Sequence, residues 1–240
     1  MSSAPKVWYS YKGKYSGKNP PFYNLDGIAW YDKLKYNLPD IRDKLLPFLK
    51  TDGIDIQEYF NTSMVEGTGW EGVSFMFWKL RNEKIISKGR DVFEYFNDIP
   101  GIVSLSVSIL QPKTIIKGHH GDTDATYRFH IPVYIPAQLP DCGLTVAGTT
   151  KPWIENEIIC FCDACFHAAW NMADKPRIIM IMDVIKDEFL PQTDKICANV
   201  LSSLKYQHFS LKYKFVKKFP GWLKDIIRNI LKFYPIDNIK

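Results

Sequence analysis

The chain has 240 residues, of which 46% are hydrophobic and 15% aromatic, and its formal net charge is +5. This length and apolar content can bury one substantial core, so we expect a single domain with flanking elements. The charge is uneven: residues 202–240 hold nine Lys or Arg and two Asp, which is +7, so residues 1–201 sum to −2. A near-neutral body with a basic tail argues against a nucleic-acid-binding protein.

The ends of the chain and its cysteines predict a soluble cytoplasmic protein. The first residues, MSSAPKVWYS, lack the apolar stretch of a signal peptide, and no run of about 18 apolar residues occurs. Five cysteines, an odd number at irregular spacing, are typical of reduced thiols rather than of a disulfide framework.

The first predicted elements are suited to covering a sheet. In residues 27–50 apolar side chains recur at three-to-four spacing, which predicts an amphipathic helix with a break or restart at Pro39. Residues 72–80, GVSFMFWKL, predict a strand, and residues 90–101, RDVFEYFNDIPG, predict a short helix ended by Pro-Gly.

Further along, the pattern changes to short β segments separated by Pro, Gly, Asp and Asn. They are IVSLSVSIL, TIIKGHH, YRFHIPVYIP, GLTVAG, EIICFC and PRIIMIMDVI. Their lengths and spacing predict a double-sheet roll or barrel. Because Pro132 removes a ladder hydrogen bond, we expect its strand at an edge or with a bulge.

We therefore predict one domain over residues 1–240 with three parts. Residues 1–98 form a helical and strand cover, residues 99–190 the core of the roll or barrel, and residues 191–240 a basic amphipathic helical tail with a terminal helix from about Pro220 to Pro235. We expect the tail to pack on the domain. A dimer contact and a peripheral membrane contact are the alternatives, and the oligomeric state stays open.

The candidate chemistry lies in two polar clusters beside apolar strands. Three of the five histidines fall in IKGHHGDTDATYRFHIPVYIP, and His167 precedes a strand that begins at Arg177. Histidines from distant strands can converge in a closed roll, and neutral imidazoles with open coordination positions suit an iron that activates oxygen. A buried arginine suits a dicarboxylate co-substrate, because its guanidinium pairs with a carboxylate through two hydrogen bonds. His119, His167 and Arg177 match this chemistry in type and order.

At these residues the sequence resembles the aspartyl/asparaginyl β-hydroxylase-like family of Fe(II)/2-oxoglutarate-dependent oxygenases, which includes lipid A acyl hydroxylases. The resemblance covers residues 99–184 through IPGIVSLSVSILQP, HHGDTDATYRFHIPVYIP, the tryptophan of KPWIENE and FHAAWNMADKPRIIMIMDV, and more loosely WYDKLKYNLPDIRDKL. The family's motif residues fall, in order, on Ser108, His119, Gly121, Arg128, His130, His167, Trp170 and Arg177.

The resemblance implies an all-β core with flanking helices, folded as a double-stranded β-helix of the jelly-roll, cupin-like kind. It implies Fe(II) held by His119 and His167, with 2-oxoglutarate as co-substrate and dioxygen as oxidant. By the same resemblance, Arg177 pairs with the distal carboxylate of 2-oxoglutarate and Ser108 hydrogen-bonds to that group. Two further residues are expected to bind a carboxylate of the co-substrate or the substrate: Arg128 and His130.

The adjacent histidines leave two registers open. His120-Gly121-Asp122 spells the His-x-Asp of the usual triad of two histidines and one carboxylate. The family spacing instead selects His119, and it implies that a water takes the place of the carboxylate at Gly121. Neighbouring strand residues face opposite ways, so both histidines cannot reach one metal from a regular strand. A site without a carboxylate also makes halogenation a minor alternative to hydroxylation.

The resemblance implies hydroxylation of an aliphatic C–H of an amino-acid-like substrate with an Asp- or Asn-type side chain, free, carrier-bound or peptidyl, with release of succinate and CO2. A lipid acyl-chain hydroxylase of the same chemistry is the alternative. A third hypothesis is a catalytically inactive, zinc-stabilised binding protein, because Cys160, Cys162, Cys165 and His167 are spaced like zinc ligands. Buried strand cysteines are more often small core residues. His120 and His208 are expected to be structural.

Overall fold

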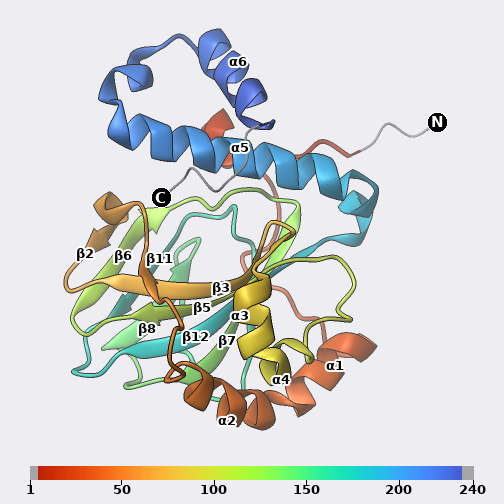
Figure 1. Cartoon of the computed structure of the whole chain (residues 1–240), viewed down its shortest axis with the longest axis vertical. Coiled ribbons are helices and arrows are strands. Elements are labelled where there is room, and N and C mark those ends of the chain that lie inside the picture. Colours follow the sequence, from red (N-terminus) through yellow and green to blue (C-terminus); the bar gives the residue numbers. More distant parts are fainter. Residues whose placement is uncertain (1–4, 234–240) are drawn as a thin grey trace.

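Two antiparallel β-sheets form the centre of the protein in a computed structural model that describes residues 5–233 (Figure 1). The larger sheet has the order β1-β3-β5-β12-β7-β10, with β4 paired to β3, and the smaller has the order β2-β6-β11-β8-β9. The larger sheet comprises β1 (Gln57–Glu58), β3 (Trp70–Phe77), β4 (Leu80–Arg81), β5 (Ile102–Leu110), β7 (Thr126–Tyr134), β10 (Ile159–Phe161) and β12 (Arg177–Ile185). The smaller comprises β2 (Val65–Glu66), β6 (Thr114–His119), β8 (Cys142–Val146), β9 (Thr149–Lys151) and β11 (His167–Asn171).

The eight strands from β5 to β12 are connected as a double-stranded β-helix. Counted from β5, their order is 1-8-3-6 in the larger sheet and 2-7-4-5 in the smaller. This is the strand order of a jelly roll, in which the chain crosses repeatedly between two facing sheets. The fold class expected from the sequence is therefore confirmed.

Most predicted β segments coincide with strands, and β11 is the main one that the pattern does not identify. Its residues, HAAWN, are poor in β-branched side chains, so their pairing with β6 and β8 decides their conformation. The expectation at Pro132 is confirmed. The β7–β12 register shifts between Ile178 and Ile179 beside this proline, and β10 pairs with β7 only as far as His130.

The helices lie at two ends of the molecule. The bounds are α1 (Ala29–Tyr36), α2 (Leu38–Phe48), α3 (Glu83–Lys88), α4 (Arg90–Phe93), α5 (Thr193–Lys212) and α6 (Gly221–Leu231). Four short 3-10 turns are η1 (Ser10–Lys12), η2 (Thr62–Met64), η3 (Asp187–Gln192) and η4 (Lys214–Lys218). Figure 1 shows α1 and α2 at one end and the hairpin of α5 and α6 at the other.

Two predicted helices have different bounds in the structure, and a third helix has no predicted bounds. The N-terminal helix breaks at Asn37, because Pro39 lies in the first turn of α2, where its missing N–H is tolerated. The helix predicted at residues 90–101 begins earlier, as α3, and α4 ends at Phe93. The longest helix, α5, lies within the predicted helical tail, but its bounds are not predicted, because its buried face includes polar Asn199, Ser202 and Ser203 and its apolar periodicity is weak. The predicted end of the terminal helix at Pro235 lies outside the described residues.

Alternate residues of the central strands face different cores, and this alternation places the site. On β12, Met180 and Met182 pack in the cluster that includes buried residues of α1 to α4, whereas Ile179 packs in the cluster between the sheets. Because side chains alternate with a period of two, Arg177 lies on the same inner face as Ile179. Inner-facing polar side chains on the other central strands follow the same alternation: Ser108, Arg128 and His130.

The packing of α2 on the larger sheet gives a stability prediction. Leu45 is 0% exposed within the helix–sheet core. Leu45→Ala is expected to lower the free energy of unfolding by about 2–5 kcal/mol, because it removes buried methyl groups and leaves a cavity. Tyr36→Ala is the control, since Tyr36 is 86% exposed and its loss should change stability by less than about 0.5 kcal/mol. Urea unfolding measures both, and equal stabilities would contradict this packing.

Candidate active site

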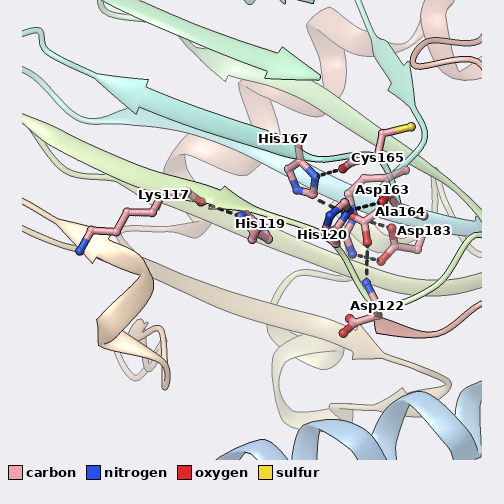
Figure 2. A network of polar contacts seen from close by, with 10 residues as sticks. Lys117, His119, His120, Asp122, Asp163, Ala164, Cys165, His167 and Asp183 are labelled. Atoms are coloured by element: carbon pink, nitrogen blue, oxygen red, sulfur yellow. Dashed lines mark hydrogen bonds and ion pairs between the residues drawn. The ribbon is translucent and has the colours of Figure 1, made fainter. Parts of the chain in front are cut away.

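Two histidines from the smaller sheet meet at one end of the roll. His119 ends β6, His167 begins β11, and the two residues are partners across the strand pair, with 4.2 Å between ring centroids. His119 Nδ1 lies 2.8 Å from the carbonyl oxygen of Lys117, and His167 Nδ1 lies 2.8 Å from that of Cys165 (Figure 2). Because a carbonyl oxygen only accepts, Nδ1 carries the proton in each ring. Each Nε2 therefore keeps a lone pair that can bind a metal.

Burial keeps both rings neutral. It lowers the pKa of His119 below its ordinary 6.5, against the opposing effect of the Lys117 carbonyl. Burial, and next the neighbouring His119, hold the pKa of His167 well below the same value. Near pH 7 the pair is therefore in the unprotonated form that metal binding requires.

His120 faces elsewhere. Its Nδ1 donates to the carbonyl oxygen of Ala164 at 2.8 Å, and its ring packs against Trp8 and Phe166. In Figure 2 the carboxylate of Asp122 points away from the two paired rings. The structure thus places His119, and not His120, beside His167. Metal binding by this pair stays a prediction.

The structure adds a carboxylate that the sequence reasoning missed. Asp163 lies between β10 and β11, its side chain is 1% exposed, and its Oδ1 is 3.6 Å from Nε2 of His167. A Cβ at Gly121 would lie 1.7 Å from Oδ2 of Asp163, so the absence of a side chain at this glycine makes room for the carboxylate. Only Asp122, the carboxylate next to the adjacent histidines, is considered in the sequence analysis. The feature that could have identified Asp163 is its position four residues before His167.

Arg128 holds Asp163 in place. Its Nη1 donates to Asp163 Oδ1 at 2.5 Å, while Nε and Nη2 donate to both oxygens of Asp183 at 2.7 and 2.9 Å. Asp183 is the partner of Arg128 across β7 and β12. Oδ2 of Asp163 also accepts from the backbone N–H of Asp122 at 3.0 Å. The expected binding of a ligand carboxylate by Arg128 stays a prediction, since the contacts observed are with internal carboxylates.

A second buried arginine lacks a carboxylate partner. Arg177 is 1% exposed, its Nη1 donates to Ser108 Oγ at 3.4 Å, and its guanidinium lies 4.7 Å from the ring centre of Trp153. Its buried Nε has no hydrogen-bond partner, and within residues 5–233 no acidic side chain forms an ion pair with it. Burial lowers the pKa of Arg177 to about 10. A buried cation without a counter-charge is destabilising, which is typical of a site for an anionic ligand.

His130 links the cation to the histidine pair. Trp153 Nε1 donates to its Nδ1 at 3.3 Å, so the other ring nitrogen carries the proton and can donate to a ligand. Burial, and then the charge of Arg177, hold the pKa of His130 well below 6.5. The ring of Phe161 packs against both His130 and His167, with 4.8 and 5.4 Å between ring centroids, so His130 lies near the histidine pair.

One wall of the site carries the N–H of an indole and the ring of a tyrosine. Trp70 Nε1 donates to Ser108 Oγ at 2.9 Å, and Tyr59 stacks on Trp70 with 4.1 Å between ring centroids. Burial, and then the carboxylate of Asp122, raise the pKa of the Tyr59 hydroxyl. This electrostatic effect places Tyr59 near the acidic side of the site.

The cysteines give no support to the zinc hypothesis. Cys160 packs in the core that faces the helices, whereas Cys162 and Cys165 pack between the sheets. Among residues 5–233, no group of three or more His, Cys, Asp or Glu is arranged to hold a metal. The pair His119 and His167 is smaller than such a group.

Comparison with known proteins places the chain in a family. The profile of the family described as aspartyl/asparaginyl beta-hydroxylase matches residues 35–187, which is more than half of the sequence. The chain therefore belongs to the aspartyl/asparaginyl β-hydroxylase family, as the sequence resemblance predicts.

Named relatives are hydroxylases with different substrates. The ornithine lipid ester-linked acyl 2-hydroxylase of Rhizobium tropici is 24% identical over 177 residues, covering 70% of this chain and 61% of that protein. The aspartyl/asparaginyl beta-hydroxylase of Homo sapiens is 30% identical over 192 residues, covering 71% of this chain and 24% of that protein. The chain thus spans less than two thirds of the length of either relative.

Solved structures overlap only weakly with this one. A viral collagen prolyl hydroxylase from Paramecium Bursaria Chlorella virus-1, described as a 2OG complex, is 14% identical with a TM-score of 0.39, covering 60% of this chain and 89% of that chain. A predicted oxalate decarboxylase from Thermotoga maritima is 10% identical with a TM-score of 0.37, covering 56% and 95%. The fold assignment rests on the strand order instead. Among the described residues, no helix combines the length and apolar character needed to cross a bilayer.

The close approach of Gly121 and Asp163 gives a testable prediction. Gly121→Ala should lower the free energy of unfolding by about 1–3 kcal/mol, because its methyl group displaces the Asp163 carboxylate from its donors. In an Asp163→Ala background the same substitution should be less destabilising, because the space is vacated. Gly221→Ala is the control, since an added Cβ there meets no atom within 4 Å. Denaturant unfolding of the four-variant cycle measures the coupling, and additive effects would contradict the geometry.

Proposed function

We propose that the chain is an Fe(II)- and 2-oxoglutarate-dependent hydroxylase that acts on an aliphatic C–H bond. The observation that carries the proposal is the fully buried Arg177, whose Nε has no partner, within the same roll as a pair of neutral histidines. A deep cation suits the distal carboxylate of 2-oxoglutarate, and two imidazoles suit an iron with open coordination positions.

The residues present fit both groups. His119 and His167 offer two nitrogen lone pairs, because their Nδ1 atoms are committed to backbone carbonyls. Asp163, whose Oδ1 is 3.6 Å from Nε2 of His167, can accept a hydrogen bond from a water on such an ion. Its negative charge also disfavours a halide at this position, which supports hydroxylation over halogenation.

The larger sheet supplies the groups for a dicarboxylate. Ser108 Oγ accepts N–H groups from Trp70 and Arg177, so its own hydrogen can be donated to a carboxylate beside Arg177. The Trp153 ring against the guanidinium keeps water from that face. His130, neutral and with its proton on Nε2, can donate to a carboxylate of the co-substrate or the substrate.

Bound iron, 2-oxoglutarate and dioxygen supply the oxidation that converts C–H to C–OH, with succinate and CO2 as the other products. The protein holds the co-substrate through Arg177 and Ser108, keeps its histidines unprotonated by burial, and excludes water with Trp153. These are positioning and electrostatic contributions, and they are what this chain adds to the chemistry of the metal.

The names of the relatives suggest which kind of C–H bond is hydroxylated. The β-carbon of an aspartyl or asparaginyl side chain and carbon 2 of an ester-linked acyl chain are both next to a carbonyl carbon. The substrate proposed is accordingly an aliphatic C–H next to a carbonyl or carboxyl group. An amino-acid-like molecule, free, carrier-bound or peptidyl, is the first candidate. An acyl lipid is the second, favoured by the exposed apolar side chains of α6.

The direct test is turnover. Purified chain with Fe(II) and 2-oxoglutarate should form succinate faster when its substrate is added, and the product should gain one oxygen atom by mass spectrometry. Aspartate and asparagine, peptides that contain them, and ester-linked acyl lipids form the panel. A chain that binds neither Fe(II) nor 2-oxoglutarate would overturn the proposal.

The histidine pair predicts which neighbour binds iron. His119→Ala should weaken Fe(II) binding by more than about 100-fold, because loss of outer-shell partners alone weakens metal sites by about 10–100-fold. His120→Ala is the matched control and should bind Fe(II) like the unmodified chain, since its ring packs against Trp8 and Phe166. Anaerobic titration measures both. The reverse result would assign the metal to His120 and Asp122.

The buried arginine predicts the requirement for 2-oxoglutarate. Arg177→Ala should weaken 2-oxoglutarate binding by about 2–5 kcal/mol, or about 30- to 5,000-fold, because the ligand carboxylate would be left buried and unpaired. Arg42→Ala is the control, because Arg42 is on α2 and pairs with Glu155 at the surface. Calorimetry with the metal-loaded chain gives both dissociation constants. Unchanged affinity in Arg177→Ala would remove this residue from the co-substrate site.

A further inference from the structure

The helix α6 presents apolar side chains outward. Trp222 is 65% exposed and Phe233, just past the helix, is 88% exposed, and between them Ile226 and Ile230 are also exposed. Their spacing of four, four and three residues puts them on one face of the helix. The opposite face buries a charge instead, since Arg228 lies 4.3 Å from the ring centre of Tyr11. A helix that only packs on a core buries its apolar face, whereas α6 exposes these apolar side chains and buries Arg228.

Further exposed apolar side chains lie at the end of α5, which contacts α6, and in the turn between the two helices, where the rings of Phe209, Tyr213 and Phe215 contact one another in sequence. We call the whole the hairpin surface, and its members are Phe209, Tyr213, Phe215, Trp222, Ile226, Ile230 and Phe233. These are seven of the seventeen large apolar side chains exposed among residues 5–233, yet they come from 25 consecutive residues. Such a concentration is typical of an interaction site rather than of ordinary surface.

The segment that carries the hairpin surface is also rich in basic residues. Residues 209–233 contain seven Lys or Arg and one acidic residue, Asp225, a net charge of +6. The carboxylate of Asp225 accepts a hydrogen bond from Arg228. Four lysines of the turn are exposed: Lys212, Lys214, Lys217 and Lys218. Exposed apolar and aromatic side chains together with exposed lysines are the composition that binds the interface of an anionic bilayer.

We propose that the hairpin surface docks on an anionic lipid bilayer, with its apolar side chains at the acyl boundary and its lysines at the lipid phosphates. A second copy of the chain fits less well, because two faces of net charge +6 would repel each other. A nucleic acid also fits less well, since the central Ile226 and Ile230 offer no aromatic face for base stacking.

The hairpin surface is connected to the candidate active site. The ring of His208 on α5 lies 6.1 Å from that of Phe60, which is itself exposed. The next residue, Tyr59, stacks on Trp70 at the wall of the site. Docking of the hairpin would therefore hold the segment that carries Tyr59 near a bilayer, which would favour an acyl lipid as the substrate. That last step rests on the proposed function, whereas docking itself does not.

Vesicle flotation of the full chain tests the proposal. The chain should float with vesicles of phosphatidylcholine and phosphatidylglycerol, should float poorly with phosphatidylcholine alone, and should be released by added salt. Brominated lipids should quench part of its tryptophan fluorescence. Failure to bind the anionic vesicles, or equal binding to both kinds, would overturn the proposal.

Two sets of substitutions locate the surface. Trp222→Ser/Ile226→Ser/Ile230→Ser should weaken vesicle binding by at least about tenfold and remove the quenching by brominated lipid. Lys217→Ser/Lys218→Ser should weaken binding about 5- to 30-fold and leave less salt dependence. These side chains are exposed, so folding measured by circular dichroism should be unchanged. Full vesicle binding by both variants would overturn the proposal.

Matched controls come from the opposite end of the molecule. Tyr36→Ser removes an exposed aromatic ring of α1, and Lys33→Ser/Lys84→Ser removes two exposed lysines from α1 and α3 (Figure 1). Both controls should bind anionic vesicles like the unmodified chain. If vesicle binding weakened as much in the controls as in the hairpin variants, binding would depend on the overall charge or hydrophobicity of the protein. This result would overturn the assignment to the hairpin surface.

Other occupants and the proposed chemistry are separated by further measurements. If the unmodified chain does not bind vesicles but forms a dimer that the apolar substitutions dissociate, the surface would be a dimer interface. If it does not bind vesicles but binds single-stranded RNA, the surface would be an RNA-binding site. Either result would overturn the proposal. Turnover of 2-oxoglutarate without vesicles should be the same in all variants, because none lies in the site. If the unmodified chain binds vesicles but shows no turnover, the docking proposal would hold and only the hydroxylase proposal would be overturned.

Discussion

The ion-pair network of Arg128 is the constraint on which the candidate site depends. Its guanidinium joins Asp183 on β12 to Asp163 in the segment between β10 and β11, and so ties the larger sheet to the chain that enters His167. Removing one member would leave a buried charge uncompensated, which is strongly destabilising. Asp163 in turn occupies the space that Gly121, two residues after His119, leaves open. The approaches to both histidines are therefore positioned by one cation.

The two interior arginines show how the same residue type serves different purposes. Arg128 is neutralised by two carboxylates of the protein, so its charge is used for structure. Arg177 has only the hydroxyl of Ser108 and the ring of Trp153, and its Nε is unsatisfied. A folded chain tolerates such a deficit where a ligand completes it. This contrast supports our proposal that Arg177, and not Arg128, binds an anionic ligand.

The molecule is also polarised along its length. Helices α1 to α4 close one end over the larger sheet, whereas the hairpin of α5 and α6 presents apolar and basic side chains at the other (Figure 1). Relatives are named for an aspartyl or asparaginyl substrate and for a lipid substrate, and the chemistry that we propose is compatible with both. The features that we propose to select the substrate therefore lie outside the roll, on the hairpin of α5 and α6.

Strand periodicity, a local property of the sequence, predicted a double-sheet roll or barrel, and the resemblance of the motifs to a known family supplied the jelly-roll class and the residues proposed for the metal site. The sequence by itself could not choose between His119 and His120 from geometry, and it missed Asp163, because the vacancy at Gly121 and the carboxylate that fills it lie in different segments. The bounds of α5 could not be predicted, because its buried face is partly polar. The sequence also could not show that Ile226 and Ile230 face outward. Packing against Tyr11 and Tyr206 draws Arg228 inward, and only tertiary contacts decide which face of an amphipathic helix is covered.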